Sequence, residues 1–72
     1  MVFIDLEPVS SSNLASVGYD DQLQILRVAF KNGTVYDYFG VSQDVYQNLM
    51  SAPSLGHFHY FNIRMSYAYQ QV

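Results

Sequence analysis

Cysteine is absent from this chain of 72 residues. Its absence excludes a disulfide framework, a thiolate metal site and a cysteine nucleophile, and nothing points to an oxidising compartment. No run of apolar residues approaches the ~18 residues of a membrane-spanning helix. The first seven residues hold two acids, Asp5 and Glu7, and no base, which is unlike a signal peptide. We therefore expect a cytoplasmic protein without a membrane partner.

Charged residues are scarce, at 12% of the chain against about 25% in a typical domain. Three are basic and six are acidic, so at most three phosphates can be neutralised, which argues against duplex DNA as a partner. Seven tyrosines and five phenylalanines are present instead. We expect a single domain over residues 1–72 with a modest core and an aromatic surface that meets a partner, such as another copy in a homo-oligomer.

Three stretches alternate apolar and polar side chains with the period of a β-strand, at residues 13–19, 24–30 and 34–39. The second is the clearest, because Leu26, Val28 and Phe30 share one face of it. Asp20-Asp21 supplies a turn before it. These patterns predict an antiparallel sheet of three strands.

The turn Lys31-Asn32-Gly33 decides how the second and third strands pair. A two-residue loop would set Asp37 opposite Val28 and leave a carboxylate on the apolar face, which is costly. A three-residue loop, with Gly33 in the left-handed conformation, sets Asp37 opposite Arg27 instead. We predict the three-residue loop. The expected pairs are Val28 with Tyr36, Leu26 with Tyr38 and Arg27 with Asp37.

After Gly40 the apolar spacing becomes helical. Ser42 is a typical N-cap, and Pro53 ends a predicted helix of about nine residues. Helical spacing of Phe58, Phe61 and Met65 favours a second short helix over residues 54–64. The tail at 67–69 alternates as a C-terminal strand does. The predicted fold is α+β, a three-stranded antiparallel sheet followed by one or two short helices packed on one face.

Several motifs in this order resemble the KTSC domain family over residues 8–72. They are Val17-Gly18-Tyr19-Asp20, the block Leu26-x-Val28-x-Phe30-x-x-Gly33-x-x-Tyr36-x-Tyr38, Ala52-x-Ser54-x-Gly56, and Ile63-Arg64-x-x-Tyr67-x-Tyr69. The central mark of the family is the Tyr-x-Tyr pair, here Tyr36-Asp37-Tyr38. One stretch departs from the family pattern, because His59-Tyr60 follow Phe58 where the pattern has Phe-Asn.

The resemblance implies a small domain that occurs at the C-terminus of some lysyl-tRNA synthetases and as stand-alone bacterial and phage proteins. The synthetase association implies RNA binding. The resemblance to the small phage members of the family implies an accessory protein that binds a host partner or a small nucleotide. The length of this chain favours the stand-alone group.

Residues suited to catalysis are few. Ser10, Ser11, Ser12 and Ser54 are nucleophiles only beside a base, and no Gly-x-Ser-x-Gly turn is present, so we expect them to cap loops. The acids stand singly apart from Asp20-Asp21, which leaves no carboxylate pair for acid–base chemistry. We expect no enzymatic activity, no catalytic residues and no cofactor.

His57-x-His59 is the one spacing in the sequence that suggests a metal site. Both imidazoles would share a face on a strand but would point about 200° apart on a helix, and a third ligand is still needed. We therefore expect no metal. The alternative is two surface or interface imidazoles with some pH dependence.

Arg64 is the strongest candidate for binding. Its guanidinium lies in an aromatic-rich segment, where it can bind an anion bidentately or stack on tyrosine. A salt bridge to Asp20 or Asp37, or a contact with a backbone carbonyl at a helix end, explains it equally well. Tyr36 and Tyr38 likewise form either a core pair with hydroxyls at the rim or a surface for stacking bases. The expected ligand-binding residues are Arg64, Tyr36, Tyr38, Ser54, Gly56 and Tyr67.

Two functions follow from these residues. The first is a binding module for a nucleotide-type ligand, and three basic residues favour a small nucleotide over single-stranded RNA. The second is a protein-interaction or self-association module with exposed aromatic and aliphatic anchors. The expected anchors are Phe3, Ile25, Phe39 and Phe61.

Overall fold

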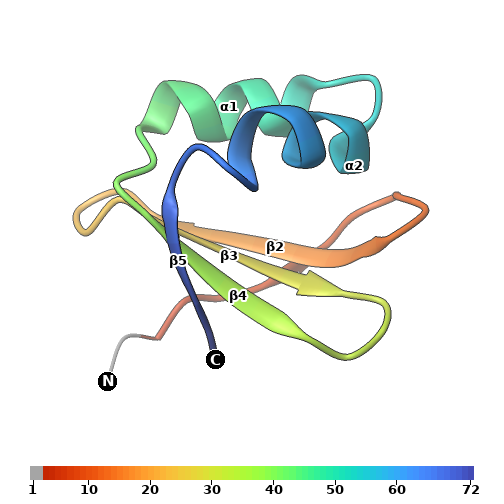
Figure 1. Cartoon of the computed structure of the whole chain (residues 1–72), viewed down its shortest axis with the longest axis horizontal. Helices are drawn as coiled ribbons and strands as arrows, with labels where there is room; N and C mark the ends of the chain where they lie inside the picture. Colours follow the sequence, from red (N-terminus) through yellow and green to blue (C-terminus); the bar gives the residue numbers. More distant parts are fainter. Residues whose placement is uncertain (1–2) are drawn as a thin grey trace.

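A computed structural model describes residues 3–72 as one antiparallel sheet with helices on one side (Figure 1). The strands lie in chain order and are β1 (Glu7–Pro8), β2 (Leu14–Asp20), β3 (Ile25–Phe30), β4 (Val35–Phe39) and β5 (Ala68–Gln71). The helices are α1 (Gln43–Ser51), α2 (Leu55–Phe58) and the π-helical segment η1 (His59–Ile63). Among the residues described, no helix is long and apolar enough to cross a membrane.

The predicted α+β class and the three central strands are confirmed, but the predicted sheet was too small. The strand at the C-terminus, left open by the sequence, does form and pairs with β4. β1 was not predicted, because it has only two residues and one of them is proline. Such a strand has no alternation to detect, and it forms because Glu7 and Pro8 pair with Val17 and Ser16 of β2.

The hairpin between β3 and β4 has the predicted three-residue loop. Gly33 has a φ of +95°, its N–H donates to the carbonyl of Phe30 at 3.0 Å, and the Phe30 N–H donates to the carbonyl of Thr34 at 2.8 Å. The observed pairs include the three that were predicted, namely Leu26 with Tyr38, Arg27 with Asp37 and Val28 with Tyr36. The register places both tyrosines on the face that the helices cover.

A bulge between Leu14 and Ser16 shifts the register of β2 against β3. It lets Leu14 and Val17, three positions apart, both enter the core under the helices, where neither is more than 1% exposed. Simple alternation places them on opposite faces. The core is completed by buried residues from both layers, which are Leu26, Val28, Tyr38, Val41, Leu49 and Ile63.

The first helix was predicted correctly. The Ser42 hydroxyl accepts from the N–H of Val45 at 3.3 Å, and the nine-residue α1 ends at Ser51, before Pro53. Leu49 is its buried residue. α1 contacts α2, and Leu49 lies in the core with strand residues, so the helices form one layer above the strands (Figure 1).

The second helical stretch is confirmed as α2 followed by η1, but its inward face differs from the apolar spacing. Phe61 is 69% exposed and Met65 is 85% exposed. The buried positions are Gly56, His59 and Ile63 instead. The wider π turn is closed by the Arg64 N–H, which donates to the carbonyl of His59 at 2.9 Å.

The opposite face of the sheet is covered in part by the N-terminal segment. A side chain at Gly18 would collide with the backbone oxygen of Asp5, so the segment lies directly against β2. Ile4 and Ile25 are both buried on this side. The expectation that Ile25 is an exposed interface anchor is therefore wrong, whereas Phe3 and Phe61 are exposed and Phe39 is 37% exposed.

Candidate functional site

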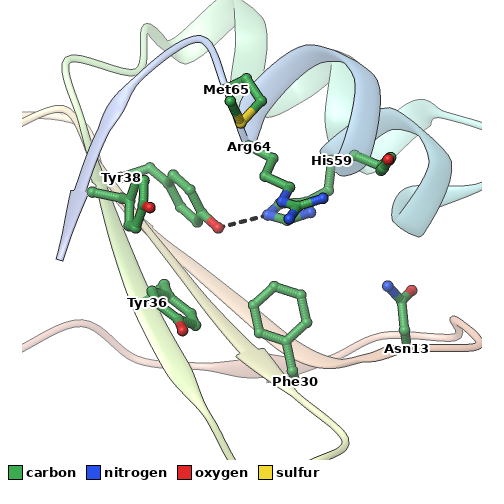
Figure 2. Close-up of a pocket in the computed structure, with 9 residues that line it drawn as sticks. Asn13, Phe30, Tyr36, Tyr38, His59, Arg64 and Met65 are labelled. Atoms are coloured by element: carbon green, nitrogen blue, oxygen red, sulfur yellow. Dashed lines mark hydrogen bonds between the residues drawn. The ribbon is translucent and has the colours of Figure 1, made fainter. Parts of the chain in front are cut away.

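A cavity of about 380 Å³ lies between the helix-covered face of the sheet and the C-terminal helical segment (Figure 2). Its size falls in the range of small-molecule sites, about 300–1,000 Å³. Strands, the helical segment and loops all contribute to it, and none of the described residues that line it is acidic. The lining residues are Asn13, Phe30, Tyr36, Tyr38, His59, Tyr60, Arg64, Met65 and Tyr69.

The sheet side of the cavity is made of aromatic rings from three neighbouring strands. Phe30 of β3 meets Tyr36 of β4 edge-on at 6.0 Å between ring centroids, and Tyr36 meets Tyr69 of β5 at 5.9 Å. Tyr69 lies here because it pairs with Tyr38 across β4 and β5. Rings on adjacent strands present π-faces to a planar ligand without requiring any one base.

Two buried side chains that line the cavity, Tyr38 and His59, form a hydrogen-bonded pair. The Tyr38 hydroxyl oxygen lies 2.8 Å from Nε2 of His59 (Figure 2). Burial, with Tyr36 and Tyr69 nearby, raises the pKa of Tyr38 to about 12. Burial and the nearby Arg64 charge lower the pKa of His59 to about 4. Both groups are therefore uncharged at neutral pH.

The position of His59 corrects the expectation of two surface imidazoles. His59 is 4% exposed and packs edge-on against Phe30, with 5.2 Å between centroids, whereas His57 is exposed. The two rings differ in environment because the segment is helical. No cluster of three His, Cys, Asp or Glu side chains able to hold a metal ion occurs in residues 3–72.

Arg64 supplies the positive charge at the cavity. Its guanidinium carbon lies 5.2 Å from the ring centroid of Tyr60, one helical turn earlier. Within the described part of the chain, the one salt bridge joins Arg27 to Asp37, through two hydrogen bonds of 2.7 and 2.9 Å. Asp37 is therefore already engaged, and Arg64 has no carboxylate partner there.

Asn13, the residue before β2, borders the cavity. Its backbone carbonyl accepts from the N–H of Lys31 at 2.9 Å, which holds it beside Phe30 at the end of β3. Its side-chain oxygen accepts from the Ser11 hydroxyl at 3.2 Å. The cavity therefore has a guanidinium on one element and an amide on another, with aromatic rings between the two elements.

The structure brings three of the six predicted binding residues together, namely Arg64, Tyr36 and Tyr38. Ser54 does not line this cavity, because its hydroxyl caps α2 by accepting from the N–H of His57 at 3.2 Å. Gly56 is buried against the side chain of Asn13. Tyr67 is half-buried and packs against the core.

Sequence reasoning missed six lining residues, which are Asn13, Phe30, His59, Tyr60, Met65 and Tyr69. The sequence did contain a pattern that pointed to Tyr69, because alternation in the tail places Tyr69 on the same face as the predicted residue Tyr67. Pairing with Tyr38 decides that Tyr69 reaches the cavity. Asn13 and His59 had no such signal, since their roles depend on contacts with distant elements.

A second hollow of about 450 Å³ lies near the N-terminal segment and has the opposite character. It is bordered by Asp5, Glu7, Asp20 and Asp21. Tyr19 and Tyr46 also border this hollow, but four carboxylates in one open depression repel an anion. The candidate site for an anionic ligand is therefore the cavity beside Arg64.

Two comparisons with known proteins, a family model and a solved structure, name the same family. The family described as the KTSC domain matches residues 10–67. An uncharacterized protein of Stutzerimonas stutzeri is 42% identical over 65 residues, which cover 89% of this chain and 92% of that protein. A protein of Tsukamurella paurometabola is 40% identical over 53 residues, 74% of this chain and 79% of that protein. The crystal structure of a KTSC domain protein from Yersinia pestis superposes with a TM-score of 0.91 at 35% identity, covering 97% of this chain and 99% of that one.

Proposed function

Since the chain belongs to the KTSC domain family, we propose that it works as that family's stand-alone form, a non-enzymatic domain that binds a small nucleotide-type anion in the cavity beside Arg64. The proposal includes an accessory role of the kind inferred for small phage members. Such a protein would hold its ligand without converting it. A cytoplasmic setting, where nucleotides are found, belongs to the same proposal.

The observation that carries the proposal is a guanidinium at the edge of an aromatic cavity that pairs with no carboxylate of residues 3–72. A phosphate can accept two parallel hydrogen bonds from a guanidinium, and these charge-assisted bonds are among the strongest available. A base can then lie against Phe30, Tyr36 or Tyr69, whose rings line the same space. Charge and stacking surface are thus present together.

The number of free cations favours a small ligand over single-stranded RNA. Of the three basic residues, Arg27 is bonded to Asp37. This leaves Arg64 at the cavity and Lys31 in the β3–β4 turn. A protein that follows a nucleic-acid backbone uses a groove with many phosphate contacts.

The arrangement of polar groups supports a non-enzymatic role. The buried imidazole of His59 is engaged with Tyr38 and has a pKa of about 4, too low for a general base at neutral pH. The hydroxyls of Ser42 and Ser54 cap helices, and that of Ser11 holds Asn13. None of these serines is placed beside the imidazole as a nucleophile.

Arg64→Ala is expected to weaken binding of nucleoside 5′-monophosphates about 30-fold, because a charge-assisted hydrogen bond contributes about 2 kcal/mol. The four ligands to titrate by calorimetry are UMP, CMP, IMP and AMP. Lys31→Ala is the matched control, since it removes the same charge from a residue outside the cavity. It should leave the affinity unchanged.

Two results of this titration would contradict the proposal. If the wild-type protein binds none of the four nucleotides at millimolar concentration, the cavity is not a nucleotide site. If Lys31→Ala weakens binding as much as Arg64→Ala, the attraction is a general charge effect and is not located at the cavity.

Self-association is the second candidate function, favoured by the exposure of Phe61. Its ring is 69% exposed and lies edge-on to His57 at 4.5 Å and to Tyr60 at 5.0 Å, so that aromatic side chains gather on the outer face of η1. Aromatic side chains that are exposed in a free subunit are typical of the centre of an interface, where they become buried when the subunits associate.

Sedimentation equilibrium at increasing protein concentration tests this second function. For an apolar interface we expect a dimer that persists from 0.1 to 1 M salt and that dissociates at least tenfold more readily in Phe61→Ser. Leu23→Ser is the matched control, because Leu23 is also exposed but lies in the turn between β2 and β3 and is not one of the expected anchors. A protein that stays monomeric at millimolar concentration would rule out the dimer.

A further inference from the structure

Asn13 is held in place by bonds that leave its side chain at the cavity. Its N–H donates to the Ser11 hydroxyl at 3.4 Å, and the N–H of Leu14 donates to the same oxygen at 3.2 Å. Its carbonyl accepts from Lys31. The backbone of Asn13 is therefore tied both to the preceding loop and to the end of β3.

The side-chain amide of Asn13 has one orientation. Its oxygen accepts from the Ser11 hydroxyl at 3.2 Å and lies against Gly56, where any side chain would collide with it. Figure 2 shows the amide nitrogen on the side that faces the cavity and the oxygen on the far side. The group offered to a ligand is therefore an NH₂, which donates two hydrogen bonds and accepts none.

We infer that Asn13 recognises a carbonyl oxygen of the bound ligand, so that the cavity prefers nucleotides with an oxo base, such as uracil or hypoxanthine. This inference rests on the proposed function, because it assumes that Arg64 holds the phosphate. The base then lies over Phe30, the ring beside Asn13, and directs its exocyclic group toward the amide (Figure 2).

The selectivity follows from hydrogen-bond complementarity. UMP and CMP differ at C4 of the base, and IMP and AMP differ at C6, where an oxygen acceptor in the first of each pair becomes an NH₂ donor in the second. Two NH₂ groups facing each other leave donors unpaired once the ligand has displaced water. We expect about fivefold tighter binding of UMP than CMP, and of IMP than AMP.

Asn13→Ala tests the inference with the same four nucleotides. The variant removes the amide and retains Arg64, so the two preferences should fall to about one while CMP and AMP bind as before. Asn13 is exposed and its backbone bonds do not need the side chain, so we expect the variant to fold.

Gly56→Ala is a second variant that leaves Asn13 in the chain. The added methyl group would displace the Asn13 amide, the flexible end of a side chain, and should reduce the preference in the same direction. The control is Gly33→Ala, which adds a methyl group in the β3–β4 turn, where no atom lies within 4 Å of it. Because φ of Gly33 is positive, this variant strains the backbone, but it should leave the preference for oxo bases unchanged.

The outcomes separate this inference from the proposed function. If the wild-type protein binds each oxo and amino pair equally, and Arg64→Ala still weakens all four, the role of Asn13 is wrong and the nucleotide site stands. The role is also wrong if the preference persists in Asn13→Ala. If no nucleotide binds, the proposed function fails, and the inference with it.

Discussion

Asp37→Ala is expected to lower the free energy of unfolding by about 3 kcal/mol, because it leaves the Arg27 guanidinium without a partner in the sheet. Both oxygens of Asp37 bind Arg27, and the two side chains are only 7% and 18% exposed. Urea denaturation followed by circular dichroism measures the change. Such a loss is a large fraction of the stability of a domain this small.

Two further variants identify the cause of that loss. Asp21→Ala removes the same charge from an exposed turn and should change the free energy by less than about 0.5 kcal/mol. Replacing both partners, as Arg27→Leu with Asp37→Leu, should recover much of the stability, since no uncompensated charge remains. An Asp37→Ala variant as stable as Asp21→Ala would show that the pair is solvated and contributes little.

Lowering the pH from 7 to 4 is expected to destabilise the fold by about 3 kcal/mol through His59. Its pKa is about 4 in the folded protein, below the ordinary value of 6.5, chiefly because the imidazole is buried. Between these two values the unfolded chain binds a proton that the folded chain does not. The stability is fully present above pH 6.5 and declines as the pH falls towards 4.

Urea denaturation at several pH values measures this slope in the wild type and in His59→Asn. The variant has no proton to bind at this position, so its stability should change less between pH 6.5 and 4. His57→Asn is the matched control, because it removes an exposed histidine two positions away and leaves the buried pair intact. If His59→Asn and the wild type lose stability in parallel, another group causes the acid sensitivity.

Local patterns were sufficient to predict the central hairpin and the first helix. The register of β3 and β4 follows from the cost of a carboxylate on the apolar face, and Arg27 does pair with Asp37. The N-cap at Ser42 needs only residues within one turn. In both cases the competing alternatives differ by interactions between residues close in the chain.

The edge strands were harder to predict because their formation depends on partners. β1 is two residues long and includes Pro8, while β5 is exposed along its length and ends in two glutamines. β1 has no alternation at all, and the alternation over residues 67–69 is too short to decide that β5 forms. The inward face of the second helical stretch depended in the same way on packing, which selected His59 and Ile63 over Phe61 and Met65.

The residues of the candidate site also divide into those that the sequence identified and those that depended on packing. Tyr36, Tyr38 and Arg64 were identifiable as aromatic and basic residues in a chain with few charges, and the structure places them around one cavity. Ser54 and Gly56 were chosen as ligand contacts for their residue types, but one caps α2 and the other packs against Asn13. A residue type indicates what a side chain is able to bind, while its neighbours determine what it does bind.

The sequence by itself determined the α+β class, the central register, the first helix and the scarcity of cations, because these follow from composition and from residues near one another in the chain. Tertiary structure alone decided the burial of His59 beside Tyr38, the orientation of the Asn13 amide and the freedom of Arg64 from any carboxylate among residues 3–72. The first two features depend on contacts between segments far apart in the chain, Tyr38 with His59 and Asn13 with Gly56, and the third depends on where the core packing places the carboxylates.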